Sequence, residues 1–215
     1  ADAPAGYWRM GDLGVSTTDE TSSNSGALNG TCGLETGALT GDTNRAMTFD
    51  GTSCLVSLGD ALDFPGNAPF TVEAWVRPNA AGTYQIIFMH ETRTGTEPVD
   101  GYALVLSPTG AYIERIVGMA AEATAPQPLT AGEFAHLVGT YDGTNLAMFI
   151  NGAKAGASVP APDVMPVVSI ETTIGAIFEL FAYFDGAIDE VAIYDQALSA
   201  ARIALHYDVA INGPR

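Results

Sequence analysis

The chain has 215 residues, of which 47% are hydrophobic, and it carries a formal net charge of −17. A length of this order suits one large all-β domain, and the hydrophobic share excludes a disordered chain. The negative charge would repel phosphate groups, which argues against nucleic acids and anionic membrane surfaces as partners.

Short apolar runs separated by turn residues predict a series of β-strands. The run at residues 70–77 is the clearest, because its side chains alternate between two faces and Pro78 ends it. The pair Asp142-Gly143, between two apolar runs, is typical of a hairpin turn. Further strands are predicted at residues 6–10, 45–50, 54–59, 84–90, 101–107, 111–118, 134–142, 146–152, 153–159, 172–176 and 184–195.

In the last of these runs, residues 184–195, strict alternation places Asp189 on the same face as the apolar Val191 and Ile193. Its neighbour Glu190 is then expected on the opposite face. A carboxylate on a face that should be buried needs a cation or several hydrogen-bond donors.

After the strands, Ser199 is a candidate N-cap for a helix over residues 201–210. About a dozen short strands and one C-terminal helix predict two packed antiparallel sheets. The sequence shows no internal repeat and no linker, so we expect a single domain over residues 1–215. No apolar run approaches the ~20 residues of a membrane-spanning helix, so we expect no membrane insertion.

The two cysteines, Cys32 and Cys54, flank predicted strands in a loop-rich chain. An even count permits one disulfide, and two buried free thiols are the alternative. We predict the bridge.

Six segments, in order, resemble a laminin-G-like jelly-roll domain of the concanavalin-A-like lectin/glucanase superfamily. They are GYWRMGD, DETSSNSGALNG, AMTFDG, FTVEAWVRP, EFAHLVGTYDG with LAMFING, and FDGAIDEVAIYDQALS. The resemblance implies an all-β, two-sheet antiparallel jelly-roll sandwich. It also implies an extracellular or cell-surface recognition module that binds carbohydrate or protein and belongs to a larger protein. The opening ADAPAG is similar to what remains after cleavage at a small-residue site, so a mature form or an excised module is expected.

Similar jelly rolls often hold a structural calcium ion between the N-terminal segment and the last strand. Here the resemblance points to Asp189 and to Asp50 with the Gly51 carbonyl, and further candidates are Asp12 and Asp19. Calcium prefers six to eight oxygen ligands, which carboxylates and carbonyls supply. For Asp189 a second possibility stays open, in which backbone N–H groups satisfy the carboxylate without a metal.

Ligands of this fold are expected on the concave face, where aromatic rings stack on sugars and polar groups bind hydroxyls. The candidates are Trp75, Tyr84, His90, Glu91, Tyr102 and Tyr112. For each of them, packing within the sandwich is the alternative, since aromatic residues in strands are usually half-buried.

The sequence lacks the signatures of catalysis expected on this fold. Retaining glycosidases of the superfamily carry Glu-x-Asp-x-(x)-Glu on one strand, with two carboxyl groups about 5–5.5 Å apart. Glu73 is alone on its strand, and no Gly-x-Ser-x-Gly elbow accompanies the histidines. We therefore predict a non-catalytic module, carbohydrate-binding first. The alternatives are a glycoside hydrolase or polysaccharide lyase, and a structural or adhesive module that binds protein.

Overall fold

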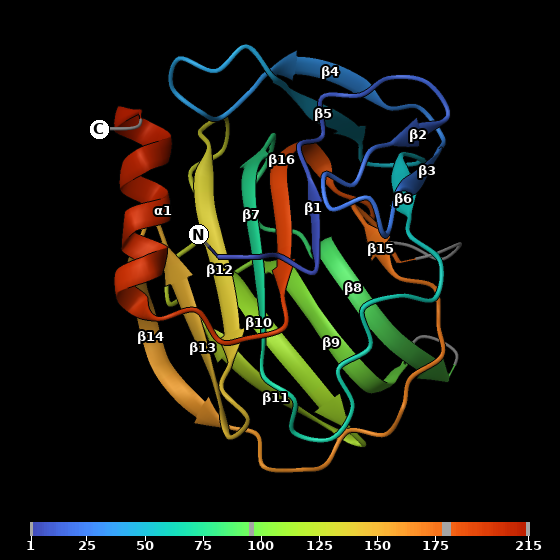
Figure 1. Cartoon of the computed structure of the whole chain (residues 1–215), viewed down its shortest axis with the longest axis vertical. Helices are drawn as coiled ribbons and strands as arrows, with labels where there is room; N and C mark the ends of the chain where they lie inside the picture. The colour runs from blue at the N-terminus through green and yellow to red at the C-terminus, as the bar shows by residue number, and fades with distance from the viewer. Residues whose placement is uncertain (1, 95–96, 178–181, 214–215) are drawn as a thin grey trace.

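The computed structural model describes residues 2–94, 97–177 and 182–213 of the chain. Within these residues, two antiparallel sheets of eight strands each face one another, and one α-helix follows the last strand (Figure 1). The two-sheet antiparallel sandwich with one short C-terminal helix that the sequence predicts is confirmed.

The first sheet, sheet A, has the order β14-β13-β12-β7-β16-β5-β4, and β1 pairs with β16 beside this path. The strands of sheet A are β1 (Gly6–Trp8), β4 (Gly33–Thr36), β5 (Arg45–Asp50), β7 (Phe70–Pro78), β12 (Ala135–Tyr141), β13 (Asn145–Ile150), β14 (Ala153–Pro160) and β16 (Asp185–Tyr194).

The second sheet, sheet B, has the order β11-β10-β9-β8-β15-β6-β3-β2. The strands of sheet B are β2 (Ser16–Thr17), β3 (Gly26–Asn29), β6 (Leu55–Ser57), β8 (Gln85–Thr94), β9 (Glu97–Ser107), β10 (Gly110–Val117), β11 (Met119–Thr124) and β15 (Thr173–Ile174).

One hydrophobic core fills the space between the sheets, and β7 shows how the sequence builds it. Phe70 and Val72 belong to this core and are at most 1% exposed. The alternate residues Glu73 and Trp75 lie on the outer face of sheet A, where Trp75 stacks on a helix residue, Tyr207. The predicted alternation of this strand is therefore confirmed.

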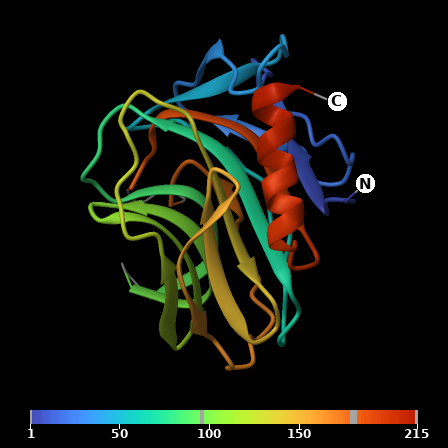
Figure 2. The ribbon, with the colours of Figure 1, turned by 90° about the vertical axis from the view of Figure 1, so that its left-hand side faces the viewer.

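The helix α1 (Ala200–Asn212) lies on the outer face of sheet A (Figure 2). Ser199 is its N-cap, as predicted, and the Ser199 hydroxyl accepts a hydrogen bond from the Arg202 N–H at 3.3 Å. Ile203 and Leu198 pack against Phe149 of sheet A. Among the described residues, no helix is long and apolar enough to cross a bilayer.

A β-bulge in β16 corrects the predicted alternation of this strand. Its pairing with β7 shifts register between Asp189 and Ala192, and Glu190 has a φ of 48°. Ile188 and Val191 both belong to the core between the sheets. Asp189 and Glu190 therefore lie together on the outer face, and the expectation that Asp189 shares a face with Val191, opposite Glu190, is wrong.

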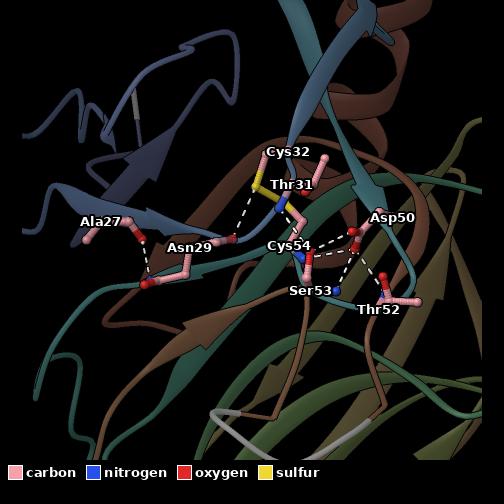
Figure 3. The surroundings of a disulfide bond; sticks show 8 residues. All are labelled: Ala27, Asn29, Thr31, Cys32, Asp50, Thr52, Ser53 and Cys54. Atoms are coloured by element: carbon pink, nitrogen blue, oxygen red, sulfur yellow. Dashed lines mark hydrogen bonds between the residues drawn. A yellow bond between two sulfur atoms is a disulfide. The ribbon is translucent and has the colours of Figure 1, made fainter.

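Cys32 and Cys54 form a disulfide with a Cα–Cα distance of 5.1 Å (Figure 3). Cys32 directly precedes β4 of sheet A, and Cys54 directly precedes β6 of sheet B. The bridge therefore ties together the segments that lead into opposite sheets, and the prediction of a disulfide is confirmed.

Candidate functional site

The six residues predicted to bind a ligand lie in four different places. Tyr102 is in the core, and the His90 ring lies 5.5 Å from it between ring centroids. Trp75 is 5% exposed beneath α1. Glu91 is 1% exposed, while Tyr112 packs on the cluster at the outer face of sheet B. Tyr84 alone among the six is widely exposed, at 63%.

Tyr84 stands at a groove of about 590 Å³ at one end of the sandwich, which we call the rim groove. Three chain segments build it. Its lining residues are Asp50, Gly51 and Thr52 at the end of β5 and after it, Thr83, Tyr84 and Gln85 before β8 and at its start, and Ala182, Tyr183 and Asp185 before β16 and at its start.

The Asp50 carboxylate organises the first wall of the rim groove. It accepts hydrogen bonds from the backbone N–H groups of Thr52, Ser53 and Cys54 at 2.7–3.0 Å, and from the Ser53 hydroxyl at 2.6 Å (Figure 3). Burial opposes the ionisation of this carboxyl, but these donors outweigh it and lower the pKa of Asp50. Thr31 N–H donates to the Ser53 hydroxyl at 3.0 Å, beside the disulfide. This wall is therefore fixed before any ligand binds.

The neighbouring part of the groove lining is held by side-chain amides. The Gln85 carbonyl accepts from the Asp185 N–H at 2.8 Å, and the Gln85 amide donates to the Thr83 hydroxyl at 2.8 Å. Asn79 donates from its amide to an Asp185 carboxylate oxygen at 2.8 Å. The carboxylate of Asp185 is thus held in one orientation in the groove that Tyr84 also lines, an arrangement suited to hydroxyl groups on a flat ligand.

The four carboxylates predicted to bind calcium do not gather around one point. Asp50 pairs with Asp185 across β5 and β16, four residues along the strand from Asp189. At strand spacing, Asp189 therefore lies about 13 Å along the sheet from the Asp50–Asp185 pair. Asp19 accepts four backbone N–H groups and the Thr21 hydroxyl, and Asp12 accepts the Thr18 N–H.

The described residues also contain no group of three acidic, histidine or cysteine side chains placed to hold a metal. The residues present therefore do not fit one calcium ion shared by Asp189 and the Asp50-Gly51 turn. The Asp189 carboxylate instead accepts from the Ala38 N–H at 2.8 Å and the Glu190 N–H at 3.1 Å. This is the second possibility that the sequence leaves open, while calcium itself stays an untested prediction.

Substitution of Asp189 tests whether a cation or the backbone N–H groups satisfy its carboxylate. Burial raises the pKa of Asp189 from 3.8 to about 7, so the stability that this group contributes below pH 3.8 is lost as the pH rises to about 7. Asp189→Asn removes the buried charge but leaves one acceptor oxygen for the two N–H donors. By urea denaturation, we expect its effect on the free energy of unfolding to be more favourable at about pH 8 than near pH 4, by roughly 2 kcal/mol.

The exposed Asp195→Asn change is the matched control and should have no effect at either pH. Destabilisation by Asp189→Asn in calcium but not in chelator would contradict this account, since it would place a cation on Asp189.

A second recess of about 320 Å³ lies between α1 and sheet A, and we call it the helix pocket. Its walls include Tyr7, Trp75, and two carboxylates, Glu73 and Glu190, each 6% exposed. Tyr7 OH and the Arg9 guanidinium donate to Glu190, the latter at 3.0–3.1 Å. Burial raises the pKa of Glu190 despite these partners.

Glu73 is the centre of a charged network that the sequence did not predict. His136 Nε2 lies 2.6 Å from one Glu73 oxygen, and His206 Nδ1 lies 3.1 Å from both. Burial disfavours the charged form, but the two histidines outweigh it and lower the pKa of Glu73 to about 2. The partners come from β12 and α1, 63 and 133 residues away, so no local pattern could reveal them.

Comparisons with known proteins agree with this architecture. A family model described as concanavalin A-like lectin/glucanases superfamily matches residues 50–204. No curated protein sequence matches the chain. Among solved structures, domain 4 of AbnA, a GH43 extracellular arabinanase from Geobacillus stearothermophilus in complex with arabinotriose, superposes with a TM-score of 0.73 at 19% identity. That match covers 96% of this chain and 98% of that one.

Two further neighbours are parts of larger chains. The binding domain of botulinum neurotoxin serotype G has a TM-score of 0.72 at 11% identity, over 96% of this chain and 51% of that one. Trypanosoma rangeli sialidase in complex with sialic acid has a TM-score of 0.66 at 14% identity, over 95% of this chain and 32% of that one. At these identities the likeness shows the fold alone, a jelly-roll sandwich.

Proposed function

The chain belongs to the concanavalin A-like lectin/glucanase superfamily, and from that premise we propose that it is a non-catalytic carbohydrate-recognition module whose ligand lies in the rim groove. The observation that carries the proposal is the exposed Tyr84, which lines a groove whose polar groups are already held by hydrogen bonds. An exposed aromatic face beside oriented hydrogen-bonding groups suits the apolar face and the hydroxyls of a sugar.

The similar structures support the ligand class. The arabinanase domain is of the same size as this chain and was solved with arabinotriose, and the sialidase was solved with sialic acid. We infer that this chain acts likewise as one module of a larger extracellular protein. The disulfide supports the compartment, because such bridges persist in oxidising surroundings.

Catalysis is the alternative function, and the helix pocket holds the two buried carboxylates that would have to carry it. The two histidines lower the pKa of Glu73 to about 2, which makes Glu73 unsuited to act as a general acid near neutral pH. Burial raises the pKa of Glu190, but Tyr7 and Arg9 already donate to its carboxylate. Both carboxylates thus already have partners within the protein. Release of reducing sugar that is lost in Glu73→Gln would overturn the non-catalytic proposal.

Substitution of Tyr84 tests the proposed site. Tyr84→Ala removes the exposed ring, and we expect the Kd for a bound oligosaccharide to rise at least tenfold, or about 1.4 kcal/mol. Tyr84→Phe keeps the stacking face and should stay within a few-fold of the wild type. Titration calorimetry with arabinotriose, and with hits from a glycan array, provides the measurement.

Met119→Ala is a matched control, since Met119 is another widely exposed apolar side chain, at 80%. It should leave the affinity unchanged. Binding that is indifferent to Tyr84→Ala would place the site elsewhere, and the absence of any glycan ligand would favour the structural or adhesive alternative.

A further inference from the structure

The ring of His206 is held between two carboxylates. His206 Nδ1 lies 3.1 Å from each Glu73 oxygen, and His206 Nε2 lies 2.9 Å from Asp2 Oδ2. A neutral imidazole carries only one N–H, so it would direct a lone pair at one of these carboxylates. Both contacts are favourable only when both ring nitrogens carry protons, and this geometry requires the imidazolium.

The three groups come from parts of the chain that are remote in sequence. Glu73 lies on β7, His206 lies on α1, and Asp2 lies in the segment that precedes β1. Both Figures 1 and 2 place the N-terminal end of the chain beside α1. We propose that His206 is a proton-dependent clasp that ties α1 and the segment before β1 to sheet A, and that loss of one ring proton loosens both.

The groups around His206 determine how far α1 detaches from sheet A when the clasp opens. Arg202, one turn earlier on α1, donates from Nε to Asp2 at 2.8 Å, and His136 on β12 contacts Glu73 at 2.6 Å. The Tyr194 ring of β16 lies 6.2 Å from the His206 ring. These contacts remain when His206 loses a ring proton, and Ile203 stays buried against sheet A. We therefore expect local opening of α1, while the sandwich stays folded.

The direction of the pH dependence follows from the carboxylates. The hydrogen bond to Glu73 and then that to Asp2 outweigh burial and raise the pKa of His206 above 6.5. The stability that the clasp contributes is therefore fully present below pH 6.5, and it is lost as the pH rises through the raised value. The clasp is closed in mildly acidic solution and open in alkaline solution.

Hydrogen exchange of the α1 amides, corrected for the intrinsic effect of pH, measures the opening directly. Between about pH 6 and about pH 9 we expect the opening of α1 to increase tenfold or more, the factor for losing one charge-assisted hydrogen bond. In His206→Gln, α1 should open to the same extent at both pH values. Asp195→Asn removes an exposed charge just before α1 and should respond as the wild type does.

A second measurement needs no variant. The midpoint of the exchange transition should coincide with the titration of the His206 imidazole followed by NMR. Exchange of α1 that does not depend on pH would overturn the proposal, as would a midpoint that departs from the His206 titration. A pH response that survives His206→Gln would overturn it as well.

Discussion

Glu73→Ala is expected to lower the free energy of unfolding by roughly 3 kcal/mol near neutral pH, the cost of removing one partner of a buried ion pair. The Glu73 side chain is 6% exposed and contacts both His136 and His206. Without it, His206 keeps only Asp2 as a carboxylate partner, and the buried His136 loses its Nε2 partner. The loss should appear as a lower urea midpoint with an unchanged slope.

The pH dependence of this effect has a defined sign. The pKa of Glu73 is lowered from 4.5 to about 2, so its contribution is present above pH 4.5 and is lost as the pH falls through about 2. The wild type and Glu73→Ala should therefore converge in stability at strongly acidic pH. Glu133→Ala, at an exposed position, is the control and should change little. If Glu73→Ala lowered the free energy of unfolding by less than ~1 kcal/mol, the claim that Glu73 stabilises the fold through both histidines would be contradicted.

Removal of the disulfide is expected to cost about 3 kcal/mol, the loop-closure entropy for a sequence separation of 22 residues. The double change Cys32→Ala with Cys54→Ala tests this by urea denaturation, and alanine avoids placing a hydroxyl at the buried Cys54. The Cys54 N–H also donates to Asp50 at 2.9 Å, so we expect weaker binding of sugar in the rim groove.

Reduction of the wild-type protein provides the matched comparison, because it opens the bridge without changing any side-chain carbon. The reduced wild type and the double variant should each be less stable than the oxidised wild type by a similar free energy. Reductant should have no further effect on the double variant. Equal stability of the oxidised and reduced wild type would contradict the account.

Most of the fold could be predicted from local pattern, because alternation and capping depend on neighbouring residues. The strand at residues 70–77 and the Ser199 cap illustrate this. Strands with weak patterns were missed, such as β4 and β11, since small or partly exposed residues give no clear periodicity. The bulge after Asp189 was missed too, because register depends on the partner strand.

The candidate site was much less predictable. Tyr84 is a ligand candidate from its residue type, and the resemblance predicts Asp50 and Gly51 as calcium ligands; all three line the rim groove. Tyr183 and Asp185 also line this groove, and no pattern in the sequence marked either of them. Three loops assemble the groove, and only the packing of the sandwich brings them together.

Mapping of amide chemical shifts during titration with a bound oligosaccharide tests the central claim most directly. We expect the perturbed amides to cluster in residues 50–53, 79–85 and 182–185, the segments that build and flank the rim groove. Perturbations confined to the outer face of sheet B around Tyr112, or to the helix pocket around Trp75, would contradict the assignment of the sugar to the rim groove.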